Sequence, residues 1–108
     1  MSWQDTIIAA HTAVTDMVSH AQRLKSERYF VWQEAGAHDF IADEKHAERA
    51  MTGTTDLFTK HEFDPWVAAI EESFDATPAI VWALSSVQFE EDTGFYHYEW
   101  SWQVFDDG

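Results

Sequence analysis

Cysteine is absent from this 108-residue chain, and proline, glycine and basic residues are few. Without cysteine the chain can form no disulfide, zinc–thiolate site or iron–sulfur cluster, and it has no thiol for catalysis. Two prolines and four glycines provide no Pro/Gly-rich linker, so we expect one domain over residues 1–108. No basic, apolar leader or bilayer-length apolar run is present, which predicts a soluble, intracellular protein.

The scarcity of basic residues is the second absence. Twenty acidic residues face six basic ones, giving a net charge of −14. Residues 1–60 contain all six basic residues and nine acidic ones (net −3), whereas residues 61–108 contain eleven acidic residues and no Lys or Arg (net −11). Nucleic-acid binding and attraction to anionic membranes both depend on Lys and Arg. The charge therefore excludes ordinary nucleic-acid binding, disfavours a membrane surface, and in its simplest interpretation serves solubility.

Apolar and aromatic residues are plentiful, which argues against disorder: 45% of the chain is hydrophobic and 16% aromatic. The three-and-four spacing of apolar residues predicts an amphipathic helix over 4–25, with Ser2 as its cap. Residues 29–32 are aromatic and β-branched, as is typical of a strand. Residues 33–48 lose their periodicity and gain charge, which predicts a long, flexible loop.

The second half of the chain has clearer signals. Asp64-Pro65 begins a helix, with Asp as N-cap and Pro at the first helical position, and Thr77-Pro78 ends it. Alternating aromatic and polar residues over 95–105 are typical of a strand with one buried face. The remaining predicted elements are a strand over 49–58, a hairpin arm over 79–90 and a turn over 91–94. The order α-β-β-α-β-β predicts an α+β domain, an antiparallel or mixed sheet with two helices on one face.

No motif assigns an enzymatic activity. The chain has no Gly-x-Ser-x-Gly elbow and no Gly-rich phosphate loop, so we expect no catalytic residue, no cofactor and no metal. One alternative stays open, because four residues of the expected loop could place ligands around a divalent cation: Asp39, Asp43, His46 and Glu48. A solvated acidic loop is the simpler interpretation. His11 and His20, nine residues apart in the expected helix, would face opposite sides and could not share a metal, while His61 and His97 are expected at the surface.

The aromatic residues of the last strand favour packing over base stacking. Tyr96, Tyr98, Trp100 and Trp102 lack the Lys and Arg that frame aromatic residues in single-strand binders. Core packing or a subunit interface explains them better, which favours a protein that assembles.

Several stretches resemble small prophage proteins of the head-to-tail region. They are Tyr29-Phe30-Val31-Trp32-Gln33-Glu34, Ala42-Asp43, Thr52-Gly53-Thr54-Thr55-Asp56-Leu57-Phe58-Thr59-Lys60, the Asp64-Pro65 helix, and Asp92-Thr93-Gly94 leading into His97-Tyr98-Glu99-Trp100. Over about residues 28–105 the element order is similar to that of bacteriophage tail terminator, or tail completion, proteins and related head–tail connector proteins.

The resemblance implies a ring-forming subunit, commonly a hexamer, that caps the tail tube in the virion, contacts the head connector and lets DNA pass. Rings use heterologous contacts between subunits. The residues proposed for contacts with a subunit or partner are Arg28, Arg49, Asp56, Phe58 and Lys60, with Lys25 as a further basic group. Glu90, Glu91 and Asp92 are candidates for an acidic lumen or partner face, where carboxylates would repel DNA phosphates.

Two other functions remain as alternatives. The strongly acidic second half would suit a DNA mimic that inhibits a nucleic-acid-binding enzyme. A small-ligand enzyme would require a closed pocket with convergent polar groups, which sequence alone does not reveal.

Overall fold

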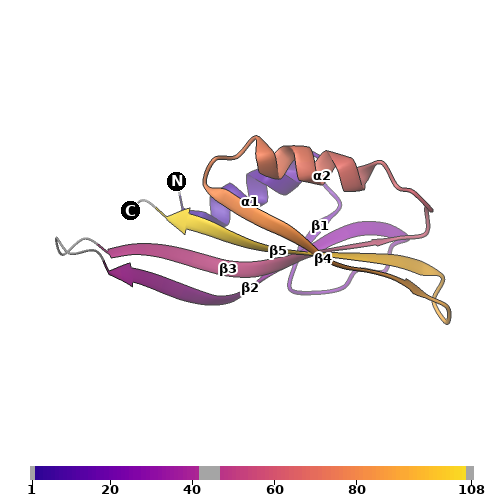
Figure 1. Cartoon of the computed structure of the whole chain (residues 1–108). Coiled ribbons are helices and arrows are strands. Elements are labelled where there is room, and N and C mark those ends of the chain that lie inside the picture. The colour runs from indigo at the N-terminus through magenta and orange to yellow at the C-terminus, as the bar shows by residue number, and fades with distance from the viewer. Residues whose placement is uncertain (1, 42–46, 107–108) are drawn as a thin grey trace.

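A five-stranded sheet with two helices on one face forms the protein (Figure 1). The computed structural model describes residues 2–41 and 47–106. The elements are α1 (Trp3–Thr12), β1 (Val18–His20), β2 (Arg28–Ile41), β3 (Ala47–Thr59), α2 (Trp66–Asp75), β4 (Ile80–Glu90) and β5 (Phe95–Asp106). The predicted α+β class is confirmed, and the sheet is mixed. β1 is a strand that the sequence did not predict.

The strand order β1-β2-β3-β5-β4 determines the shape of the molecule. β1 pairs parallel to β2, and the other neighbours pair antiparallel. The domain is elongated, with extents of 52 × 23 × 20 Å, because the β2–β3 and β4–β5 hairpins project in opposite directions beyond the helices (Figure 1). Neither helix is long and apolar enough to span a bilayer within the described ranges.

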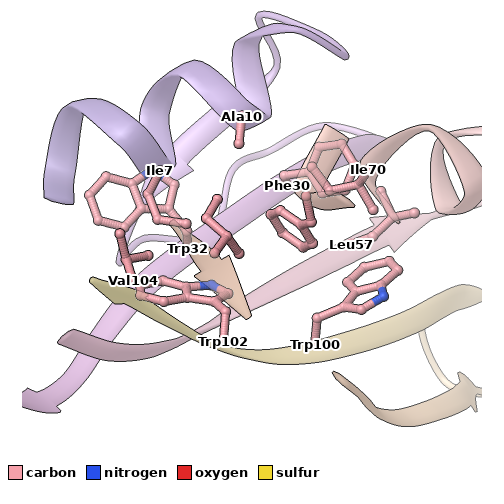
Figure 2. Packing of buried hydrophobic residues seen from close by; sticks show 11 residues of the cluster. Ile7, Ala10, Phe30, Trp32, Leu57, Ile70, Trp100, Trp102 and Val104 are labelled. Carbon is pink, nitrogen blue, oxygen red and sulfur yellow. The ribbon is translucent and has the colours of Figure 1, made fainter. Parts of the chain in front are cut away.

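The predicted hairpin at the end of the chain is confirmed. β4 and β5 pair from Ile80↔Val104 to Glu90↔Phe95. The alternation in β5 turns Trp100, Trp102 and Val104 toward the helices, where each is at most 2% exposed. Figure 2 shows these three side chains packed with residues from α1, β2, β3 and α2, which together form the main core.

The first helix is much shorter than the predicted 4–25. It ends at Thr12 and is capped at Ala13. The next residues then pair with the sheet, because the Phe30 N–H donates to the Met17 carbonyl and β1 runs beside β2. The apolar pattern continued past the helix end because Val14 and Val18 still pack on the core, from a turn and a strand.

The predicted loop over 33–48 is mostly strand where the structure describes it. β2 continues to Ile41 and β3 begins at Ala47, extending the predicted strands at 29–32 and 49–58. Residues 42–46 of that loop lie outside the described residues. A register shift between Glu34 and Gly36 interrupts the alternation of side chains along β2, which explains why the sequence shows no period there.

The second helix begins where the sequence predicted, except that its first helical residue is Trp66, one position later than expected. Asp64 Oδ1 accepts from the Trp66 N–H at 2.8 Å, and Pro65 is the N-cap of α2 rather than its first helical residue. The helix ends at Asp75, before Thr77-Pro78, as predicted.

Candidate functional site

The open face of the sheet, opposite the helices, carries its own aromatic cluster. Tyr29, Val31 and Phe58 are buried there, and Phe95 packs against them. The Tyr29 and Phe58 rings stack at 5.4 Å, and Phe58 meets Phe95 edge-on at 6.2 Å. These residues alternate along β2, β3 and β5 with those of the main core, so one sheet has an apolar centre on both faces.

A basic side chain covers this cluster in place of a helix. The guanidinium of Arg23, from the segment between β1 and β2, lies 4.0 Å from the Phe58 ring centroid. Its Nε donates to the Tyr29 hydroxyl at 3.4 Å, and an Nη lies 3.8 Å from Glu90 Oε1. A planar cation over an aromatic ring is a favourable contact that also shields the ring from water.

His97 lies among carboxylates on the same face. Its ring stacks on Phe58 at 4.3 Å, its Nε2 is 3.6 Å from Asp56 Oδ2, and its Nδ1 is 3.6 Å from Glu90 Oε2. The interaction with Asp56 is the main cause that raises the pKa of His97. Burial opposes it, and the negative charges of Asp56, Glu90 and Glu99 add to it. The imidazolium form is therefore favoured between these acids.

A cation-binding geometry is present in the same place. One ligand atom each from Asp56, His97 and Glu99 lies within 4.8 Å of the others, and the buried Asp56 Oδ1 and His97 Nε2 have no hydrogen-bond partner. Among the described residues these are the ones that could hold a divalent ion. The raised pKa of His97 opposes metal binding here, because a protonated ring nitrogen cannot act as a metal ligand.

Three of the residues predicted for contacts, Asp56, Phe58 and Lys60, come together here with Glu90, which was predicted for the acidic face. The Lys60 ammonium donates to the Thr93 carbonyl and lies 4.5 Å from the Phe95 ring centroid. Glu91 and Asp92 are exposed in the adjacent β4–β5 turn. The sequence did not predict the roles of Arg23, Tyr29, Phe95 and His97 in this cluster.

Two predicted residues lie elsewhere. Arg28, on the helix side, forms a two-armed ion pair with Asp64, with Nε 2.7 Å from Oδ2, and stacks 3.7 Å from the Trp66 ring centroid. Burial opposes the charge of Asp64, but hydrogen bonds from Arg28, the Trp66 N–H and Thr59 outweigh it, so the pKa of Asp64 is lowered. Arg28 therefore stabilises the junction of sheet and helix.

Arg49 lies near the start of β3, away from the aromatic cluster of the open face, with Asp39 and Asp106 as its cross-strand neighbours. Its side chain lies outside what the structure describes, as do those of the possible loop ligands Asp39, Asp43, His46 and Glu48.

A second histidine lies on the covered face and, unlike His97, is fully buried. His11 is 0% exposed and bonds the Ile7 carbonyl through Nδ1 (2.7 Å) and the Thr55 hydroxyl through Nε2 (2.9 Å). A carbonyl only accepts, so Nδ1 carries the proton, and Thr55 donates to Nε2 while accepting from Trp102 Nε1 at 2.9 Å. Burial lowers the pKa of His11 to about 4, partly offset by the bond to Ile7. This chain of bonds fixes the neutral tautomer.

The predicted placement of His20 in the same helix is wrong. His20 lies in β1, stacks on Trp32 at 4.1 Å and bonds Glu34 Oε1 at 2.8 Å.

Comparison with solved structures finds chains of similar fold. No protein-family model matches the chain, and no curated protein matches it in sequence. Its fold is similar to that of a chain in the virion of a native gene transfer agent (GTA) particle, with a TM-score of 0.52 and 11% sequence identity. The match covers 99% of this chain and 92% of that one. At this identity the likeness concerns the fold.

Proposed function

We propose that this chain is a non-enzymatic structural protein of a phage or phage-like virion, acting at the head–tail junction to complete the tail as a ring through which DNA passes. The observation that carries the proposal is the match over 99% of the chain to a virion chain. The sequence resemblance to tail completion proteins, found independently, points to the same setting.

Charge supports the part concerning DNA. The second half of the chain is net −11 with no Lys or Arg, so a surface built from it repels phosphates and lets a duplex move without binding. Exposed Glu91 and Asp92 in the β4–β5 turn are suitably placed for such a surface. The partners of the protein would then be copies of itself, tail-tube proteins and head-connector proteins.

The DNA-mimic alternative is less well supported. A mimic presents exposed carboxylates that imitate phosphates, whereas Asp56 and Glu90 are only 20% and 24% exposed and lie beside His97. These two carboxylates interact with His97 of the same chain.

Addition of the protein to tail tubes tests the proposal. Purified protein mixed with cognate tubes that lack their completion protein should bind at one end, visible by negative-stain microscopy, and should restore joining to heads. An E91K/D92K variant should still fold and cap the tube but should impair DNA passage. A protein that never binds tube ends, or that instead captures and inhibits a nucleic-acid enzyme, would contradict the proposal.

A further inference from the structure

The two outer edges of the sheet have unpaired strand backbone. β4 is the last strand on one side. On the other side β1 pairs with β2 only at residues 30–32, so the described part of β2 from 33 to 41 has no neighbouring strand there. Unpaired edges attract further strands, and they are the places where a second chain can continue the sheet.

β4 also lacks the usual protection against such pairing. From Ile80 to Phe89 it contains no charged residue and no proline, although Lys, Pro and other charges are what natural edge strands use to prevent association. Four large apolar side chains on it are exposed: Val81 (57%), Leu84 (45%), Val87 (53%) and Phe89 (52%). In a chain of net charge −14, this uncharged edge is the surface that opposes association least.

The residue pairings show which part of the opposite edge lies at the same position along the strands as each part of β4. One row of paired residues runs across the sheet through Val87, Tyr98, Leu57, Phe30 and Val18. It ends beside Met17, which is 41% exposed. The row through Ile80 ends at Ala37, in the free part of β2. The first half of β4 is therefore in line, across the sheet, with the unpaired stretch of β2. The second half of β4 is in line with Met17.

Strand direction is compatible as well. Successive antiparallel pairings make β2 and β4 run in opposite directions. A neighbouring copy in the same orientation would place its β2 antiparallel to β4, so the sheet would continue across the joint. Such a contact joins two different surfaces, and repeating it gives a ring if the rotation closes.

We infer that β4 of one copy pairs with the free 33–41 stretch of β2 in the next copy, so that the sheet runs continuously around the assembly. This inference rests on the proposed function, because it takes a second copy of the chain as the partner. It adds which surfaces meet and in which orientation.

Engineered cysteines test the joint directly, because the natural chain has none. Val81 and Ala83 on β4 and Ala35 on β2 are exposed and line one shallow groove on the open face. Under mild oxidation, V81C mixed with A35C should give disulfide dimers, with A83C as a second choice if the register differs. The double variant A35C/V81C should give a ladder of covalent multimers. Each single variant alone should stay at the level of E72C, an exposed control on α2.

A charge at the edge provides the second measurement. V81K should shift the assembled species to monomer in sedimentation at high salt, whereas Q103K, the cross-strand neighbour of Val81 on interior strand β5, should leave the mass unchanged. Disulfide dimers of V81C alone would overturn the inference in favour of a two-fold β4–β4 contact. Equal loss of assembly in Q103K, no cross-linking above E72C, or a wild-type monomer at all salt concentrations would also overturn it. Wild-type capping of tube ends in the same experiments would leave the proposed function standing.

Discussion

Each face of the sheet holds one histidine, His11 fully buried and His97 half-buried, and the two environments shift the histidine pKa in opposite directions. His11, on the covered face, has only neutral partners, and burial lowers its pKa to about 4. His97, on the open face, lies among Asp56, Glu90 and Glu99, and its pKa is raised. Burial disfavours an imidazolium at both sites. The hydrogen-bond partners therefore determine the direction of the pKa shift. The neutral partners of His11 do not compensate for burial, whereas the carboxylates around His97 do.

The faces also differ in how they exclude water. The covered face uses two helices over a large apolar cluster that includes three of the six Trp, whereas the open face covers a small cluster with Arg23 and His97. We therefore expect the covered face to hold most of the folding free energy. The open face is expected to contribute less, and to respond to pH and to single charges.

The largest expected effect comes from truncating matched aromatic residues on the two faces. Trp100→Ala should lower the free energy of unfolding by about 3–5 kcal/mol, because the side chain is fully buried and its loss leaves a large cavity. Phe58→Ala should cost less, since the flexible Arg23 can move into the space. Urea titrations at pH 7 measure both. An equal or greater loss in Phe58→Ala would break the comparison.

His11 should make the covered face sensitive to acid. Its folded pKa is lowered to about 4, so protons bind the unfolded chain better, and stability present above pH 6.5 is lost as the pH falls toward 4. The full difference corresponds to about 3 kcal/mol. In urea titrations from pH 7.5 to 4, His11→Gln should lose stability at all pH values but show a shallower decline than the wild type. An unchanged slope would contradict the assignment.

The contribution of His97 to stability should depend on pH in the opposite direction to that of His11. Its folded pKa is raised by Asp56, with Glu90 and Glu99 adding to the effect and Arg23 lying beside Glu90. Its contribution is therefore fully present below the unfolded pKa and is lost as the pH rises through the folded value. His97→Gln should accordingly cost more stability at pH 5.5 than at pH 8. Histidine NMR titration supplies an independent check, and equal costs at both pH values would remove the contrast between the faces.

The sequence predicted elements whose pattern stayed regular. Strict alternation gave the β4–β5 hairpin, and Asp64-Pro65 gave the start of α2. The helix over 4–25 was wrong because Val18, whose spacing continued the helical pattern, lies in a strand fixed by pairing with Phe30. The predicted loop was wrong over 33–41 and 47–48, because the register shift near Gly36 hid a strand.

The candidate site was less predictable because it depends on register. His97 was expected at the surface but is only 20% exposed, because the pairing of β3 with β5 places it against Phe58. The proximity of Glu90 follows from the β4–β5 pairing, which places Gln88 opposite His97. Arg23 reaches the cluster from a connecting segment whose path depends on β1, a strand that the sequence did not reveal.

The smallest expected effect concerns the cover of the open face. Arg23→Gln removes the cation over Phe58 and should cost about 0.5–1 kcal/mol. The ion pair with Glu90 should add little to this loss, because it is long and the Arg23 side chain is 53% exposed. Lys25→Gln removes the same charge at an exposed position two residues away and serves as the matched control. If both variants lose the same stability in urea titrations, the change in net charge is responsible. The contact of Arg23 with the Phe58 ring would then not stabilise the open-face cluster.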